Sequence, residues 1–139
     1  PMTLAEALLR TLRTAALDAG HVALIGPVPE VEYDVPATLV RSLRGLSALP
    51  PLLRSDFDRR QRLVMDALAR IEKEGAAAVL YPHDVLCSDR VCSVADGVRP
   101  LYSDDDHLSA FGAERVARAL VPRLIELAGS PAAVTGSTR

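Results

Sequence analysis

Two short aliphatic runs, each placed after a segment with helical periodicity, constrain the fold of this chain more than any other feature. The first covers residues 21–25 and ends at Gly26 and Pro27, and the second covers residues 76–81. Apolar runs of this length, bounded by turn residues, are typical of strands buried on both faces. Strands separated by a helix pair in parallel through a right-handed crossover. The sequence therefore predicts an α/β domain with a parallel sheet covered by helices.

The helices are predicted from capping residues, apolar periodicity and terminal glycines. Thr3 and Glu6 form a capping box at the first helix, and Asp34 can cap the second. Apolar residues recur at helical spacing through the two longer segments that follow. The predicted helices cover about residues 3–20, 34–45, 55–75 and 109–128.

Two strands are fewer than such a sheet needs, because sheets average about five or six strands. We therefore expect residues 1–129 to form the C-terminal portion of a three-layer α/β/α domain that lacks its N-terminal half. Residues 130–139 are small and polar, and we expect them to be a disordered tail. Since the chain opens with Pro1 and Met2, which is not a natural translation start, we also expect upstream sequence.

The composition argues against nucleic acid as a partner and against a membrane span. Aromatic residues are only 4% of the chain and Trp is absent, so no aromatic platform is available for single-stranded nucleic acid. The basic residues are scattered among acids and form no run that would bind phosphates. No apolar stretch reaches the roughly 18 residues that a membrane span needs. We therefore expect no nucleic acid partner and no transmembrane segment in this chain.

Cys87 and Cys92 flank four residues between a predicted strand and a turn. A disulfide is the preferred interpretation, and loop entropy gives such a small ring about 2 kcal/mol of stabilisation. A metal site with His83 or Asp89 is an alternative, but one cysteine pair without a second ligand pair is weak support for zinc. Free thiols remain a third possibility. A structural disulfide would indicate an extracytoplasmic location.

The turn before the last helix places Asp104 and His107 three residues apart. A carboxylate at this spacing can hold the Nδ1 proton of an imidazole and leave Nε2 free to take a proton from a hydroxyl. The pair is therefore a candidate acid and general base of a serine hydrolase triad. A simpler interpretation is that the acids at 104–106 favour the positive end of a helix capped by Ser109, with His107 a surface histidine.

Other residues compete for a functional role. His83 follows the second strand and could act as the base, although its neighbour Asp84 would diverge from it on a strand. Residues 26–30 could line a substrate groove or form a rigid turn, and His21 is expected to be structural. The acidic run at 104–106 could bind a divalent cation, but it lacks the alternating carboxylates and glycine of a calcium loop.

The segment YPHDVLCSDRVCSVADGVRPLYSDDDHLSAFGAERVARAL resembles the end of SGNH domains fused to membrane acyltransferases of the acyltransferase-3 type. In those domains a strand, paired cysteines, an L-Y-x-D-x-x-H-L-S turn and a closing G-A helix follow in this order. The stretch HVALIGPVPEVEYDVP is similar to their preceding strand and loop, so the resemblance covers about residues 3–124. It implies the C-terminal portion of an SGNH-hydrolase-like, flavodoxin-like sheet domain.

The resemblance implies that Asp104 and His107 are the acid and base of a Ser-His-Asp triad. SGNH enzymes take the Ser from a G-D-S motif on the first strand and two oxyanion donors from a Gly and an Asn in later blocks, all before the strand at 21–25. No serine here lies in a G-D-S or G-x-S-x-G setting, and the donor blocks are absent. This chain alone is therefore expected to be inactive in acyl transfer.

The family further implies a parent protein that transfers an acyl group, preferably acetyl, to hydroxyls of an extracytoplasmic glycan. The site would lie in the periplasm or on the outer face of the cell membrane and would need no cofactor. The acyl donor would arrive through a membrane acyltransferase domain of the same parent. Two alternatives stay open: a secreted SGNH esterase or lipase-like hydrolase, and a noncatalytic module that binds a glycan or a partner.

Overall fold

The computed structural model describes residues 1–130 of the 139-residue chain, so the predicted tail lies outside the described residues apart from Ser130. The helices are α1 (Leu4–Asp18), α2 (Val35–Leu43), α3 (Arg54–Lys73), α4 (Pro82–Leu86) and α5 (Ala110–Gly129). The strands are β1 (Ala23–Ile25), β2 (Leu52–Leu53), β3 (Ala78–Leu80), β4 (Val91–Cys92), β5 (Ala95–Asp96) and β6 (Arg99–Pro100).

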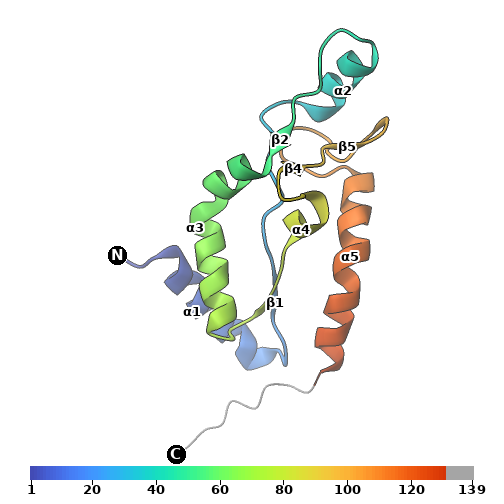
Figure 1. Cartoon of the computed structure of the whole chain (residues 1–139). Coiled ribbons are helices and arrows are strands. Elements are labelled where there is room, and N and C mark those ends of the chain that lie inside the picture. The colour runs from blue at the N-terminus through green and yellow to red at the C-terminus, as the bar shows by residue number, and fades with distance from the viewer. Residues whose placement is uncertain (131–139) are drawn as a thin grey trace, which may run out of the picture.

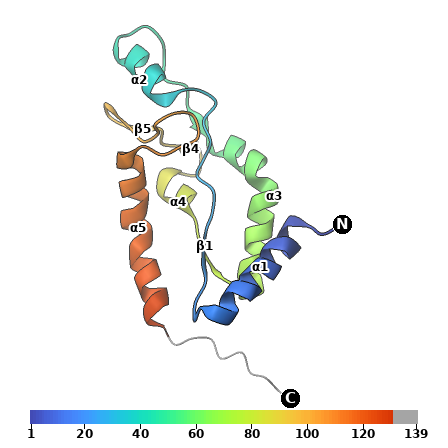
Figure 2. The ribbon, with the colours of Figure 1, turned by 180° about the vertical axis from the view of Figure 1, so that it is seen from behind.

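The predicted parallel pair is present. β1 and β3 lie side by side in parallel register, with Ala23 opposite Ala78 and Ile25 opposite Leu80. α1 and α3 pack against each other on one side of this pair, and α5 stands on the other side (Figure 1). Figure 2 shows the same arrangement from behind. The α/β fold class predicted from the sequence is confirmed.

The helix boundaries follow local chemistry. The Asp34 side chain accepts a hydrogen bond from the Ala37 N–H at 2.7 Å, as its predicted capping role requires. α3 begins at Arg54, one residue before the predicted start, and its N-cap residue Leu53 makes no side-chain cap. The Leu53 position also ends β2, so strand pairing fixes the start of this helix.

Short antiparallel pairs, which periodicity did not predict, complete the upper part of the molecule. β2 pairs with β4, and β5 pairs with β6 as a hairpin whose turn contains Gly97 at a φ of 58°. The turn requires this left-handed conformation, which glycine adopts readily and other residues adopt only at a cost in free energy. These pairs surround one hydrophobic cluster, whose fully buried members include Val35, Leu101 and Tyr102.

A second hydrophobic cluster lies between α1, α3 and the parallel strands, and it includes Leu12, Ile71 and Val79. The two clusters stabilise different parts of the fold. The lower one holds the helices against the strands, and the upper one supports the loop that carries Asp104 and His107. Within residues 1–130, no helix combines the length and the apolar character that crossing a membrane requires.

Candidate active site

The loop that carries the predicted acid and base is fixed by hydrogen bonds to the backbone of the segment after β1. The Tyr102 side chain is fully buried, and its hydroxyl donates to the Pro29 carbonyl at 2.7 Å. The Val31 N–H donates to the Asp105 carbonyl at 2.7 Å. Because both anchors involve residues 29–31, the loop lies near the carboxyl end of β1, where α/β sites gather.

Asp104 is held by its own turn. Its Oδ1 accepts the backbone N–H groups of His107 at 2.7 Å and of Asp106 at 3.0 Å. These two donors, that of His107 foremost, hold the pKa of the Asp104 carboxyl below its usual value. Oδ1 is thereby occupied, and Oδ2 remains for the imidazole.

The contact expected between acid and base is formed. His107 Nδ1 lies 2.9 Å from Asp104 Oδ2, so the carboxylate fixes the proton on Nδ1. The hydrogen bond to Asp104, with the charges of Asp104 and Asp106, raises the pKa of His107 above its ordinary value. The imidazole is 74% exposed, and Nε2 makes no hydrogen bond within residues 1–130. This nitrogen is therefore available to accept a proton from a group outside this chain.

Asp106 is exposed, with 53% of its side chain accessible, and one of its carboxylate oxygens also approaches the imidazole. Asp106 Oδ1 lies 2.7 Å from His107 Nδ1, although only the Asp104 oxygen has hydrogen-bond alignment with that nitrogen. The reason is the tight turn around Asp104, which folds the residue at 106 back toward the ring. Asp105 is exposed and forms no side-chain hydrogen bond in the described part of the chain. Asp104, Asp106 and His107 each place one donor atom within 4.8 Å of the others, a spacing compatible with a cation.

His83 does not occupy an accessible position. It is 3% exposed, and its ring packs against the rings of Phe57 and Tyr81, at centroid distances of 4.8 and 5.4 Å. The expectation that Asp84 diverges from it is wrong, because both residues lie on α4 rather than on a strand. Asp84 Oδ1 is 3.2 Å from His83 Nε2. His83 Nδ1 is buried without a hydrogen-bond partner among the described residues, which is unlike an oriented general base.

The burial of His83 predicts a pH-dependent stability. Burial lowers the pKa of His83, with an opposing contribution from Asp84. A depressed pKa means that the unfolded chain binds the proton more readily, so stability falls as pH drops below the unfolded value of about 6.5. Urea unfolding from pH 8 to pH 5 should show wild-type protein losing stability relative to His83→Leu. The matched control His21→Gln should keep the wild-type pH dependence, and parallel curves for wild type and His83→Leu would refute the assignment.

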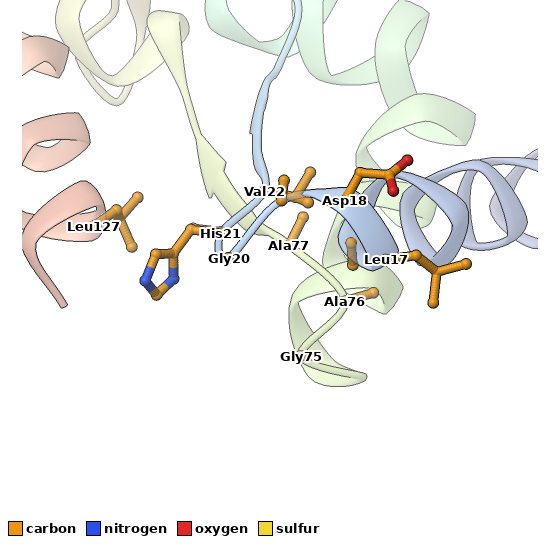
Figure 3. A pocket seen from close by; sticks show the side chains of 12 residues that line it. Leu17, Asp18, Gly20, His21, Val22, Gly75, Ala76, Ala77 and Leu127 are labelled. Carbon is orange, nitrogen blue, oxygen red and sulfur yellow. The ribbon is translucent and has the colours of Figure 1, made fainter. Parts of the chain in front are cut away.

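The remaining candidates lie around the parallel strands. Of residues 26–30, Gly26, Pro27 and Glu30 line an open groove of about 320 Å³, which Gln61 and Leu68 also border. His21 lies before β1, and its Nε2 is 2.6 Å from the Ser130 carbonyl oxygen, in keeping with a structural role. A pocket of about 470 Å³ near His21 lies at the amino ends of the strands (Figure 3), and His107 does not line it.

The predicted disulfide is confirmed: Cys87 and Cys92 are bonded to each other. The bond excludes both the thiolate metal site with His83 or Asp89 and the free thiols. It joins the end of α4 to β4, and β4 in turn pairs with β2 through Leu52. The bridge therefore stabilises the frame above the parallel strands.

Sequence reasoning missed the importance of Gly112. A Cβ atom there would overlap the Leu101 carbonyl oxygen, so only glycine allows α5 to approach this backbone so closely. Ser109 reinforces the contact, because its hydroxyl donates to the Pro100 carbonyl at 2.8 Å and accepts from the Gly112 N–H at 3.1 Å. The only signal in the sequence was a glycine in the first turn of a predicted helix.

Comparisons with known proteins agree with this architecture. No curated protein matches the chain. Among solved structures, it is similar to the periplasmic domain of the lipopolysaccharide acetyltransferase of Salmonella ser. Paratyphi A, at 20% identity and a TM-score of 0.62. The similarity covers 86% of this chain and 48% of that one, so the chain spans about half the neighbour's length. The family described as "SGNH domain (fused to AT3 domains)" matches residues 1–122, and the chain therefore belongs to that family.

Proposed function

We propose that residues 1–129 are the acid–base portion of an SGNH domain that transfers an acyl group, preferably acetyl, to hydroxyls of an extracytoplasmic glycan. The observation that carries the proposal is the 2.9 Å contact between Asp104 Oδ2 and His107 Nδ1, combined with an Nε2 that makes no hydrogen bond within residues 1–130. A carboxylate on one ring nitrogen and an open second nitrogen make the arrangement of a triad base. Family membership supplies the setting in which such a base acts.

The reaction runs in two steps, with the nucleophilic Ser supplied by sequence outside this chain. His107 Nε2 takes the hydroxyl proton while the Ser oxygen attacks the acyl carbonyl carbon, and the donor leaves with that proton. In the second step His107 takes a proton from the acceptor hydroxyl, whose oxygen attacks the acyl-Ser ester. The acylated acceptor departs and the proton returns to Ser. Asp104 stabilises the imidazolium in both steps.

The proposal places the domain outside the cytoplasm with a membrane acyltransferase domain in the same parent protein. Three observations support it. The family is defined as fused to AT3 domains, the similar solved structure is a periplasmic domain, and Cys87 is bonded to Cys92. Disulfides persist in oxidising compartments outside the cytoplasm. The glycan acceptor is inferred from the neighbour, which is a lipopolysaccharide acetyltransferase.

The test uses the full-length protein in a host that lacks its gene. We expect His107→Gln to lower glycan O-acetylation, measured by mass spectrometry, by at least about 100-fold, because general base catalysis contributes 10²–10⁴. The matched control is His21→Gln, which removes a histidine at the opposite end of β1 and should leave acetylation intact. Acetylation that survives His107→Gln would contradict the proposal. Release of free acetate without glycan acetylation would favour the esterase alternative.

A further inference from the structure

An open groove of about 540 Å³ lies between the β5–β6 hairpin and the first turns of α5. Its lining residues are charged except for one aromatic ring: Asp96, Arg99, Phe111, Glu114, Arg115 and Arg118. The arginines come from two separate segments of the sequence, and the fold brings them to one hollow. The structure thus concentrates positive charge that is scattered along the chain.

The Phe111 ring fixes the position of Arg99. The Arg99 Cζ atom lies 3.6 Å from the centre of this ring, and Phe111 itself packs against the upper hydrophobic cluster. Arg99 forms no ion pair and no side-chain hydrogen bond among the described residues. A guanidinium stacked on a ring keeps its N–H groups in plane and free to donate to a carboxylate or a phosphate. Arg99 is therefore held in a position that suits an anion.

The groove has more positive charge than its own acids neutralise. Glu114 is engaged by Arg118, whose Nε and Nη2 donate to its Oε1 at 3.0 and 2.6 Å. Asp96 lies opposite Arg99 in the hairpin register but forms no ion pair within residues 1–130. Arg115 is half-buried and likewise makes no ion pair or side-chain hydrogen bond there. Removing a guanidinium from water costs free energy unless an anion compensates, so the groove favours an anionic ligand beside Arg115.

The two walls of this groove also close the base of the loop that carries Asp104 and His107. β6 ends at Pro100, whose carbonyl accepts the Ser109 hydroxyl at 2.8 Å, and the Ser109 N–H donates to the Leu101 carbonyl at 2.9 Å. Phe111 follows His107 by only four residues. Their Cα atoms are therefore at most about 14 Å apart, a distance that a short oligosaccharide spans.

We propose that this groove binds an anionic sugar of the acceptor glycan, with Arg99 and Arg115 holding its carboxylate or phosphate group. Both groups accept paired hydrogen bonds from the fork of a guanidinium. A neutral sugar would leave the charge of Arg115 uncompensated. The inference rests on the proposed function, because the anionic group would belong to the same glycan whose hydroxyl meets His107.

The first test measures how fast phenylglyoxal modifies each arginine of the full-length protein, by peptide mass spectrometry. The probes are glucuronate and glucose 1-phosphate, with glucose as the neutral control at equal ionic strength. At concentrations that fill most sites, either anionic sugar should slow the modification of Arg99 and Arg115 at least about threefold, and glucose should not. Arg62, which is exposed on α3 and lines none of the grooves described here, should react at the same rate throughout.

Three outcomes of this footprint would overturn the proposal. The first is an unchanged rate at Arg99 and Arg115 with both anionic sugars, or equal slowing at Arg62. The second is equal slowing by inorganic phosphate, which would identify a site for simple anions. The third is that Arg99 and Arg115 react only after unfolding in urea, which would identify another part of the parent protein as the occupant.

Kinetics of the full-length protein give an independent measurement. Arg115→Gln should raise the apparent KM for the glycan acceptor at least about tenfold with kcat nearly unchanged, because a charge-assisted hydrogen bond is lost from binding. The matched control Arg62→Gln should keep the wild-type KM. A lower kcat at unchanged KM would overturn the proposal. Glycan acetylation without protection of Arg99 and Arg115 would reject the groove alone, and protection without acetylation would reject the proposed function alone.

Discussion

Asp104→Asn in the full-length protein is expected to lower the rate of acyl transfer by roughly two to four orders of magnitude. The Asn oxygen can keep the backbone N–H groups of Asp106 and His107, so the turn should stay folded. The Asn amide would instead face His107 Nδ1 with a donor. The ring proton would then move to Nε2, and the base would be lost. The measurement is the initial rate of glycan acetylation.

The neighbouring acids provide matched controls. Asp105→Asn should change the rate little, because its side chain is exposed and makes no hydrogen bond among the described residues. Asp106→Asn should have an intermediate effect, since its Oδ1 is 2.7 Å from Nδ1 without hydrogen-bond alignment. Equal losses in Asp104→Asn and Asp106→Asn, together with a wild-type rate that falls on chelation and is restored by added divalent cation, would favour a metal site over the triad base.

Gly112→Ala is expected to lower the free energy of unfolding by about 2–3 kcal/mol, at the upper end of overpacking effects. The added Cβ would overlap the Leu101 carbonyl oxygen and lie 2.9 Å from the carbonyl carbon, and backbone there cannot move aside easily. The start of α5 would shift away from Leu101 and disturb the loop before it. Urea unfolding followed by circular dichroism measures the loss.

Gly129→Ala is the control for Gly112→Ala. Gly129 also lies on α5, but a Cβ there meets no atom within 4 Å. Since alanine favours helix, this variant should be as stable as the wild type or slightly more stable. Equal destabilisation by the two variants would mean that close packing at Leu101 is not the cause.

The sequence was sufficient for features that depend on local patterns. Helical periodicity and caps predicted α1, α2, α3 and α5, and the short aliphatic runs predicted the two parallel strands. The spacing of Asp104 and His107 predicted their contact. Local patterns could not predict pairs such as Leu52 with Cys92, because strands of two residues carry no periodicity and depend on tertiary contacts.

The errors in the candidate site have similar causes. The segment after β3 was treated as extended, but Pro82 begins a short helix there, which brings the Asp84 side chain to His83. Residue spacing does not reveal how tightly a turn closes, so the approach of the Asp106 carboxylate to the His107 ring could not be predicted. The division of the chain at residue 129 and the catalytic roles of Asp104 and His107 stay predictions.

The most direct test of the central claim is covalent labelling of the full-length protein with a fluorophosphonate, followed by peptide mapping. Such a probe phosphonylates a serine, with loss of fluoride, when a base activates that serine. We predict one labelled serine, outside residues 1–139, with labelling abolished by His107→Gln and unchanged by His21→Gln. A labelled serine within residues 1–139, or labelling that persists in His107→Gln, would contradict the assignment of His107 as the base for a nucleophile supplied from elsewhere in the protein.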